Sequence, residues 1–423
     1  MNIRVLKEII AEQREYIDSA VTGVERDVLP LFEKYVKLPH TVVVSGLRRA
    51  GKSTLLCQVM RKHYKNDCYY LSFEDERLLD FTKDDFNLLY EAFMETQGEK
   101  KVFFFDEIQN VPEWEAFVRR MQDRGFKFFI TGSNASLLSK ELSTKLTGRC
   151  VTVELFPFSF GEYLRFKGVV FENDPLTAKK KAGLKKECSE YLTEGGLPEF
   201  LKYKETVIQA RVYEDILYRD IVSRHGIKEI KSLREMAHYY ISNVGKEYSY
   251  NNIKEMLKLG SENTVKSYTG YMEDSYLFLS LNKFSFSLKK QNLANKKIYC
   301  IDTGIAHTMA FKFSMDHGHL LENMAAVELR RRYKDIYYYK TDDGLEVDFL
   351  AKEQGKYILL QVTSDMSDKK VREREIAALT ASMKELKTKE GFILTENEEE
   401  DIKIKALKIT VIPLYKWLLS VKP

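Results

Sequence analysis

Nine residues at positions 46–54, GLRRAGKST, limit the folds open to this chain more than any other segment. They match the phosphate-loop pattern GxxxxGK[ST] and lie between a β-branched run, TVVV, and a helical pattern, STLLCQVMRKHY. Gly46 and Gly51 let the backbone turn its N–H groups toward an anion, and the helix that follows adds the positive end of its dipole. The sequence therefore predicts a phosphate-binding unit of strand, loop and helix.

The side chains of this loop have separate expected roles. Lys52 would neutralise the β and γ phosphates of a nucleotide, and the Ser53 hydroxyl would hold Mg²⁺. The residues expected to bind the nucleotide are Gly46, Leu47, Arg48, Arg49, Ala50, Gly51, Lys52, Ser53 and Thr54.

A pair of acids stands at the end of another apolar run. The segment KVFFFDEIQNV, residues 101–111, places Asp106 and Glu107 at the carboxyl end of a buried strand. There Asp106 can ligate Mg²⁺ through water, while Glu107 can polarise the attacking water. Because a small-molecule kinase needs an acceptor site rather than an activated water, the adjacent carboxylates favour a hydrolase.

Three further polar residues are candidates for the same site. Ser133 and Asn134 end the run FKFFITGSN, where one of them can contact the γ-phosphate or the attacking water, or both can simply cap the next helix. Arg149 immediately precedes the run CVTVEL. It can be an arginine finger, acting in cis or in trans on the transition state, or a surface ion-pair partner.

The pattern around these motifs predicts an α/β fold. From residue 41 onward, continuous apolar runs of strand length alternate with longer helical patterns, as expected for strands covered on both faces by helices. Such a layout gives a largely parallel sheet. The runs are TVVVSG, CYYLSF, KVFFFDE, FKFFITGSN and CVTVEL.

Five segments are expected along the chain. Three helical patterns in quick succession, with Ser249 and Ser261 at N-cap positions, precede a strand-like stretch, YLFLSLNKFSFSL, expected to form a hairpin. This is the layout of a winged helix-turn-helix, and the last part of the chain is a separate compact α/β unit. The predicted segments are 1–37, an N-terminal helical segment; 38–160, the phosphate-loop core; 161–231, a helical lid; 232–291, the winged helix; and 292–423, the C-terminal α/β domain.

Composition narrows the function classes. The 423 residues carry 67 Lys+Arg against 63 Asp+Glu, a balance that excludes a uniformly basic nucleic-acid coat and leaves room only for a local patch. No run approaches the roughly 20 apolar residues of a membrane helix, so we expect no membrane partner. The five scattered cysteines, without a CxxC pair, fit a reducing cytoplasm, which is the expected location.

One local basic stretch, NKFSFSLKKQNLANKK, contains no acid and interleaves its lysines with Phe284 and Phe286. It can follow a phosphate backbone of DNA or RNA, or it can be the solvated wing of a purely structural domain. The helix expected to read DNA has a negative net charge, which argues against deep major-groove recognition. The candidate nucleic-acid ligands are Lys283, Lys289, Lys290, Lys296 and Lys297.

Five motifs follow one another in order: GLRRAGKST, FFFDEIQNVPEWE, ITGSNASLLSKELSTKLTGR, LFPFSFGEYL and EGGLPEF. In this combination the chain resembles, over nearly its whole length, the prokaryotic AAA-type ATPases that carry a C-terminal domain of unknown function. The resemblance implies ATP binding by residues 46–54, a Walker B role for the adjacent acids, a sensor role for Ser133 or Asn134 and a finger-like role for Arg149. It also implies a winged helix and a C-terminal fold similar to restriction-endonuclease-like nucleases.

The C-terminal domain resembles the PD-(D/E)xK nuclease core, with Glu322 on its opening helix, Asp348 within EVDF, and Gln361 and Thr363 in LLQVT. Such sites need carboxyl or carbonyl oxygens for a divalent ion and a lysine to activate water. Here Gln361 stands where an acid is usual and Thr363 where the lysine should be. We therefore expect a catalytically silent domain that serves for binding or assembly, although Lys369 or Lys370 could substitute from the next helix.

Two classes of function are consistent with these residues. In the first, a Mg²⁺-dependent ATPase works as a switch or motor on nucleic acid. In the second, ATP regulates a protein-interaction module and no nucleic acid is involved. A homo-oligomer is expected if Arg149 acts in trans.

Overall fold

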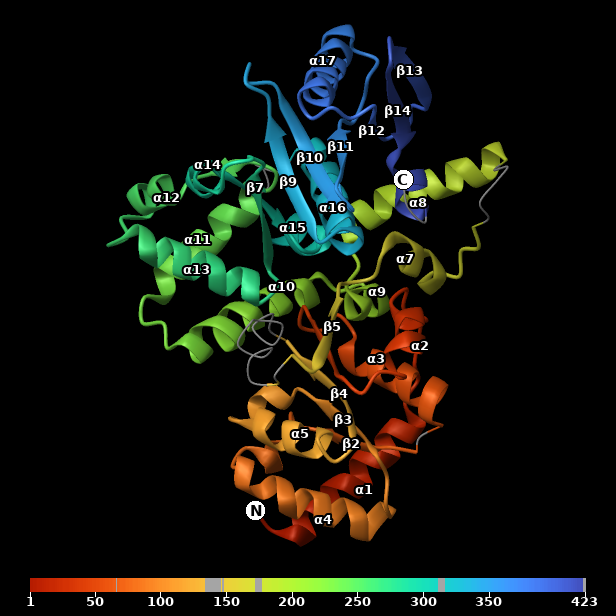
Figure 1. The fold of residues 1–423 in the computed structure, drawn as a ribbon, viewed down its shortest axis with the longest axis vertical. Helices are drawn as coiled ribbons and strands as arrows, with labels where there is room; N and C mark the ends of the chain where they lie inside the picture. Colours follow the sequence, from red (N-terminus) through yellow and green to blue (C-terminus); the bar gives the residue numbers. More distant parts are fainter. Residues whose placement is uncertain (66, 134–145, 147, 172–176, 311–315, 421–423) are drawn as a thin grey trace. The chain divides into compact units, whose positions relative to one another are not determined.

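A computed structural model describes residues 1–65, 67–133, 146, 148–171, 177–310 and 316–420. The chain forms two compact units (Figure 1). The first contains Met1–Phe156 together with Asp274–Tyr276, and the second contains Pro157–Glu273 and Leu277–Pro423.

The first unit is built on the parallel sheet that the apolar runs predict. Its five strands are all parallel and lie in the order β2-β3-β4-β1-β5. Their bounds are β1 Thr41–Gly46, β2 Tyr69–Ser72, β3 Val102–Asp106, β4 Lys127–Gly132 and β5 Cys150–Leu155. The predicted α/β fold with a parallel-sheet core is confirmed.

Both faces of this sheet are covered, because neighbouring residues of one strand point to opposite sides. On one face Val43 and Phe103 pack with apolar side chains of α1 (Ile3–Ser19), α4 (Phe86–Gln97) and α5 (Trp114–Gln122). On the other face Val42 and Phe104 pack with α2 (Phe32–Tyr35) and α3 (Lys52–Val59). The N-terminal segment 1–37 therefore belongs to this unit, and its helices contribute to both cores.

The second unit begins with helices. They include the helical block expected over residues 161–231. In chain order they are α7 Phe160–Phe166, α8 Ala178–Glu194, α9 Pro198–Tyr203, α10 Thr206–Asp215, a π-helix Ile216–Ser223, α11 Ile230–Ser242, α12 Tyr250–Leu257 and α13 Glu262–Asp274. Ser249 and Ser261 accept hydrogen bonds from the backbone N–H groups of Asn252 and Thr264, each at 3.1 Å, as expected of N-caps.

A nine-stranded mixed sheet forms the centre of this unit, in the order β13-β14-β12-β11-β10-β9-β7-β8-β6 (Figure 1). Its helices are α14 Leu288–Leu293, α15 Thr303–Met309, α16 His317–Arg332, α17 Lys369–Glu385 and α18 Leu414–Leu419. Its strands are β6 Glu247–Tyr248, β7 Phe278–Lys283, β8 Lys296–Cys300, β9 Asp335–Lys340, β10 Glu346–Glu353, β11 Lys356–Val362, β12 Glu390–Thr395, β13 Glu400–Ile404 and β14 Leu407–Pro413.

Two expectations about this region are wrong. The stretch YLFLSLNKFSFSL does not form a hairpin by itself, because β7 ends at Lys283 and pairs with β8, which follows α14. The boundary expected at residue 291/292 falls inside one continuous sheet, because β7 also pairs in parallel with β9. Backbone pairing thus joins the two segments that the sequence pattern separates.

Among the described residues, no helix combines the length and the apolar composition that crossing a bilayer requires.

Candidate functional site

The phosphate loop follows β1 directly and leads into α3, as predicted. Gly46 is required by a close approach, since a Cβ added there would lie 2.0 Å from the carbonyl oxygen of Leu155 on β5. Gly51 has a φ of +93°, a conformation that residues with a side chain rarely adopt. The two glycines of the pattern are therefore explained by local backbone geometry.

Lys52 and Glu107 form a buried ion pair, with 3.3 Å between the lysine Nζ and the carboxylate Oε1. The same ammonium lies 3.4 Å from the carbonyl oxygen of Gly46 and 3.3 Å from that of Leu47. Glu107 is held in turn by Gln109, whose side-chain amide donates to Oε2. The structure thus brings together the lysine and the acid that the sequence assigns to phosphate binding and water activation.

Thr131 connects the two acids of the site. Its hydroxyl oxygen accepts a hydrogen bond of 2.9 Å from the backbone N–H of Glu107, and the hydroxyl donates to Oδ1 of Asp106. The parallel register of β3 and β4, in which Phe105 pairs with Ile130, brings these residues to the same edge of the sheet. Thr131 is fully buried.

Sequence reasoning missed Thr131 and placed the sensor role two or three residues later. A signal was present: Thr131 is the first polar residue after the apolar run FKFFI, at the carboxyl end of its strand. Ser133 is buried, and its hydroxyl has no hydrogen-bond partner in the described part of the chain. Asn134 lies outside the described residues.

The two adjacent acids are shifted in opposite directions. Burial and the neighbouring Glu107 raise the pKa of Asp106, although hydrogen bonds from Ser53 and Thr131 oppose the rise. For Glu107, burial also disfavours the charge, but Lys52 and Gln109 outweigh it and lower the pKa. Two neighbouring carboxyl groups therefore differ in acidity, so Glu107 holds its charge more firmly than Asp106 does.

The donor set fits a Mg²⁺ ion. Ser53 is exposed at the start of α3, and its hydroxyl is hydrogen-bonded to Asp106. A hydroxyl and a carboxylate are both oxygen ligands, which Mg²⁺ prefers, and this ion usually takes only one or two protein groups beside substrate phosphates and water.

Arg149 lies at the opposite edge of the sheet. It precedes the first residue of β5, and its carbonyl oxygen accepts the backbone N–H of Thr41, where β1 begins. The phosphate loop starts after six residues of β1, a separation of about 20 Å at the usual rise per residue. The structure therefore excludes the cis finger. The Arg149 side chain is half exposed and forms an ion pair with Asp123.

The basic stretch is only partly a surface patch. Lys289 and Lys290 on α14 are exposed, and Lys283 and Lys296 are half-buried. Lys296 also lies over the ring of Tyr250, 5.6 Å from its centroid. Lys297 is different, because β8 turns its side chain into the unit and leaves it only 3% exposed. Its expected role as a nucleic-acid ligand is wrong.

Lys297 instead joins the residues of the nuclease-like site. Its ammonium lies 2.6 Å from a carboxylate oxygen of Glu346, 3.0 Å from one of Glu322 and 3.2 Å from one of Asp348. We call these four residues the lysine–carboxylate cluster. The cation that the local sequence pattern lacks at Thr363 is thus supplied by Lys297 on β8, near the beginning of the predicted C-terminal segment 292–423.

The other two residues expected in this site, Gln361 and Thr363, have different surroundings. Gln361 is buried and accepts a hydrogen bond of 3.1 Å from the backbone N–H of Asp348. Thr363 lies beyond the end of β11, and its hydroxyl donates to the carbonyl oxygen of Asp365 at 3.2 Å. Glu375 on α17, which sequence reasoning missed, is buried and close enough to Asp348 for the two charges to interact.

Charge interactions in the lysine–carboxylate cluster are strong. Burial and Asp348 raise the pKa of Glu322 to about 7, against the opposing effect of Lys297. Burial disfavours the charge of Lys297, yet Tyr299 and the surrounding carboxylates hold its pKa well above the ordinary value. Among the described residues, no group of three or more His, Cys, Asp or Glu side chains is placed to hold a metal. The cation that lies among these carboxylates is the ammonium of Lys297, a part of the protein itself.

The motif EGGLPEF has a structural explanation. Asp302 caps α15 by accepting the N–H of Ile305 and also accepts the N–H of Gly196 at 2.7 Å. A Cβ added at Gly195 would lie 2.2 Å from Asp302, and one at Gly304 would lie 2.1 Å from the carbonyl oxygen of Glu194. The glycines therefore allow two segments to approach closely.

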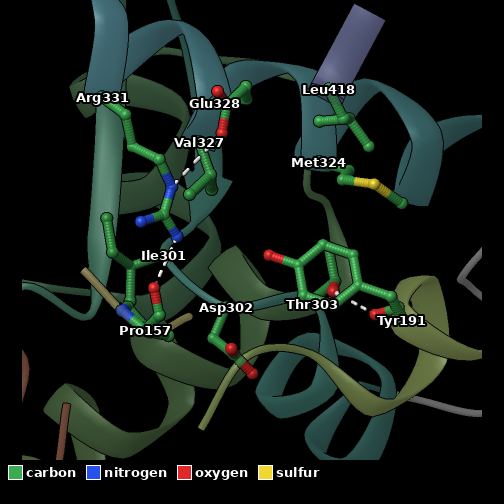
Figure 2. Close-up of a pocket in the computed structure, with 10 residues that line it drawn as sticks. All are labelled: Pro157, Tyr191, Ile301, Asp302, Thr303, Met324, Val327, Glu328, Arg331 and Leu418. Atoms are coloured by element: carbon green, nitrogen blue, oxygen red, sulfur yellow. Dashed lines mark hydrogen bonds and ion pairs between the residues drawn. The ribbon is translucent and has the colours of Figure 1, made fainter. Parts of the chain in front are cut away.

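Figure 2 shows the pocket beside this contact, which encloses about 10 Å³, room for at most one water. It is therefore no substrate site. Its lining residues are Pro157, Tyr191, Ile301, Asp302, Thr303, Met324, Val327, Glu328, Arg331 and Leu418.

Three family models match consecutive parts of the chain. The first is an AAA domain, over residues 39–164. The other two are domains of unknown function, over residues 185–316 and 317–417. The AAA match covers the parallel sheet and the whole phosphate site.

Two relatives match most of the length of the chain. The uncharacterized protein MJ1544 of Methanocaldococcus jannaschii is 35% identical over 435 residues, which cover 98% of this chain and 95% of that protein. An uncharacterized protein of Haemophilus influenzae is 28% identical over 394 residues, or 89% of this chain and 94% of that protein.

Solved structures show a distant likeness. AMPPCP-bound DnaA from Aquifex aeolicus is 14% identical with a TM-score of 0.30, covering 58% of this chain and 86% of that one. The Aeropyrum pernix Orc1 protein in complex with DNA is 12% identical with a TM-score of 0.30, covering 78% of this chain and 92% of that one. At these TM-scores the likeness carries no argument about function.

Proposed function

The chain belongs to the family of AAA-domain P-loop ATPases with C-terminal domains of unknown function, and from this premise we propose that it hydrolyses Mg²⁺-bound ATP as a nucleic-acid-directed switch. The observation that carries the proposal is the buried pair of Lys52 and Glu107 beside Asp106. Phosphate-binding lysine, water-activating acid and metal-binding acid then lie at one edge of one sheet, the set that phosphoryl transfer to water requires.

The ion pair suggests how binding and hydrolysis are linked. A β- or γ-phosphate oxygen would compete with Glu107 for the ammonium of Lys52. Because Lys52 is an important cause of the lowered pKa of Glu107, loss of this partner would make the carboxylate a stronger base. Glu107 would then be released for water activation only when phosphate is in place.

The Mg²⁺ ion would be held by Ser53 and Asp106, where it would neutralise charge on the phosphates. Thr131 would orient Asp106 by donating a hydrogen bond to its carboxylate. The same hydroxyl would fix the backbone of Glu107, so that one residue aligns both acids.

Two variants test the ATPase. Lys52→Ala should weaken nucleotide binding, whereas Glu107→Gln should keep binding and lose turnover, because only the second change removes the base. Binding is measured with a fluorescent ATP analogue and turnover by phosphate release, both with and without Mg²⁺. Arg77→Ala is the matched control, since Arg77 is an exposed residue of the short 3-10 helix Glu76–Leu78 and pairs with Asp75. Equal hydrolysis by the wild type and both site variants would overturn the proposal.

The proposed nucleic-acid surface is the remaining basic patch, Lys283, Lys289, Lys290 and Lys296. Three antiparallel strands in the order β7-β8-β6, with α11, α12 and α13, support a winged helix carrying this patch. These lysines would contact the phosphates of the nucleic acid and not the edges of its bases. The affinity for DNA or RNA should therefore depend strongly on salt concentration and little on nucleotide sequence.

The surface is tested by anisotropy titrations of DNA and RNA oligonucleotides at several salt concentrations. Each lost phosphate contact should reduce the salt slope by about 1. If replacing Lys289 and Lys290 by alanine leaves affinity and slope unchanged, the patch is a solvated wing. No binding even at low salt would favour the alternative function, an ATP-regulated protein-interaction module.

The nuclease-like domain is proposed to be catalytically silent, for a reason other than a missing lysine. Lys297 contacts three carboxylates at once and offsets part of their negative charge. We propose that this fixed cation makes the cluster a structural centre of the sheet, so that the domain serves for binding or assembly. Mg²⁺-dependent cleavage of plasmid or single-stranded DNA that is lost in Asp348→Ala would overturn this part.

A further inference from the structure

Arg26 lies on the segment between α1 and β1, outside the residues matched by the AAA family model. Its side chain is 3% exposed. One guanidinium nitrogen donates to the carbonyl oxygen of Ala50, inside the phosphate loop, and another donates to the carbonyl oxygen of Phe156, each at 2.7 Å. A single buried cation therefore connects the phosphate loop to the end of the first unit.

The contact with Ala50 bears on phosphate binding. In a planar trans peptide the carbonyl and the following N–H point in opposite directions, so holding the oxygen of Ala50 toward Arg26 turns the N–H of Gly51 away from it. Such N–H groups are the phosphate ligands of a loop of this kind. The guanidinium lies beside Gly51, since a Cβ added there would be in van der Waals contact with it, at 3.4 Å.

Arg26 is itself held in position by the helix that follows the loop. Gln58 of α3 accepts the backbone N–H of Arg26 at 3.4 Å. The side-chain amide of Gln58 also donates to the carbonyl oxygens of Thr22 and Val24, at 2.8 and 2.7 Å. The segment that carries Arg26 and the helix that carries Lys52 are thereby fastened together.

The contact with Phe156 places Arg26 at the point where the chain passes from one unit to the next. Phe156 ends the long N-terminal stretch of the first unit, and Pro157 is the first residue of the second. Arg331 of α16 donates to the carbonyl oxygen of Pro157 at 2.7 Å (Figure 2). It also donates to the carbonyl oxygen of Phe158 at 3.3 Å. Three consecutive carbonyls are thus held by two arginines, one in each unit.

We propose that Arg26 is a positioning residue for the nucleotide, which holds the Ala50–Gly51 peptide for phosphate binding and transmits its position to the backbone at residues 156–158. The inference rests on the proposed ATP binding. Nucleotide binding that shifts the loop would act on Phe156 through the same guanidinium. From there it reaches Phe158, whose N–H donates to Gly196 at 2.7 Å.

The first test measures ATP binding by the full chain with Arg26→Met. Loss of a charge-assisted hydrogen bond that orients the loop should weaken binding about tenfold or more. Arg61→Met is the matched control, since Arg61 holds the carbonyl oxygens of Ile17, Asp18 and Ala20 but does not contact the loop. It should lower the melting temperature without weakening ATP binding.

If Arg26→Met does not fold, Arg26→Lys replaces it. Its single ammonium cannot reproduce the two directed contacts, so its ATP affinity should lie below that of the wild type. The second test is amide exchange at Phe158 with saturating ATP. ATP should change the exchange rate in the wild type about threefold or more and should have less effect when Arg26 is replaced.

The measurements distinguish a failure of the proposed ATP binding from a failure of the role assigned to Arg26. A wild-type chain that does not bind ATP overturns the proposed function and this inference with it. A wild-type chain that binds ATP while the Arg26 variant binds equally well overturns only the positioning role. An ATP effect at Phe158 that is the same in the wild type and the variant overturns the transmission.

Discussion

Replacing Thr131 by valine should uncouple nucleotide binding from turnover. Valine has nearly the shape of threonine but cannot donate to Asp106 or accept from the Glu107 N–H, two hydrogen bonds that the hydroxyl makes in a fully buried position. A hydrogen bond to a charged group is worth about 1.5–3 kcal/mol, and a buried unsatisfied N–H costs about 1–3 kcal/mol. Stability should fall by a few kcal/mol.

The effect on catalysis follows from the acidity of Asp106. Its pKa is already raised by burial and by Glu107, and the hydrogen bond from Thr131 opposes that rise. Loss of this bond disfavours the charged form, so the pKa rises further and a smaller fraction of Asp106 is ionised at a given pH. An energy of about 1.4 kcal/mol per pH unit predicts that the acidic limb of the rate profile moves up by roughly one pH unit or more.

The assay is the pH dependence of ATP turnover at saturating nucleotide and limiting Mg²⁺, between about pH 5.5 and 9, because saturating Mg²⁺ would itself hold Asp106 ionised. Thr131→Val should lose turnover at neutral pH and recover part of it at high pH, while ATP affinity stays close to that of the wild type. Thr131→Ser keeps the hydroxyl and should keep the wild-type profile. Identical profiles for valine and wild type, or equal losses for serine and valine, would refute the reasoning.

Three more outcomes are expected. Glu322→Gln should flatten the pH dependence of unfolding: a pKa raised from 4.5 to about 7 means that the folded chain holds its proton more tightly, so stability falls as pH rises through that window, by about 3 kcal/mol at most in urea titrations. Lys297→Met should destabilise the chain by about 3–5 kcal/mol, because three carboxylates lose their buried cation, whereas the exposed Lys289→Met should leave the melting temperature unchanged. Mixing Arg149→Ala with Glu107→Gln subunits should restore ATPase activity if Arg149 acts in trans, and a monomeric wild type without such recovery would refute that role.

Short-range sequence patterns were sufficient to predict the strands of the first unit. A continuous apolar run can become a strand covered on both faces, and Val42 to Val44 do so because alternate residues meet the helices on opposite sides of the sheet. Gly51 is required by the positive φ of the loop itself, whereas Gly46 is required by the close approach of Leu155 on β5. The strands of the core could therefore be predicted from short-range patterns, whereas the contacts of the phosphate site, such as Lys52 with Glu107, also require the strands to pair in the observed order.

The pairing of strands that are far apart in the chain could not be predicted from the sequence in the same way. Whether β7 pairs with a following strand of the same stretch or with β8 and β9 depends on contacts between residues far apart in the chain, the nearest of which is Asn282 with Lys296. The spacing of apolar residues does not indicate which segments pair. The same holds for Arg149. Its motif is visible in the sequence, but only the parallel register, which sets it beside Thr41, shows that it lies far from the phosphate loop of its own chain.

Lys297 shows why a residue type near a motif is a weak guide to its role. Within NKFSFSLKKQNLANKK it is one of five lysines, and its sequence neighbours give it the same appearance as Lys296. Alternation along β8 separates the two, because successive side chains point to opposite faces and only one of them enters the unit. In a basic stretch that includes a strand, some lysines therefore point to the surface and others into the interior. A buried lysine needs carboxylate partners, because an unpaired buried charge is costly. Here these carboxylates are Glu322 on α16 and Glu346 and Asp348 on β10. The continuous sheet and the buried cluster are thus linked: β8 can carry Lys297 to Glu322 and Asp348 only because β7 pairs with β9.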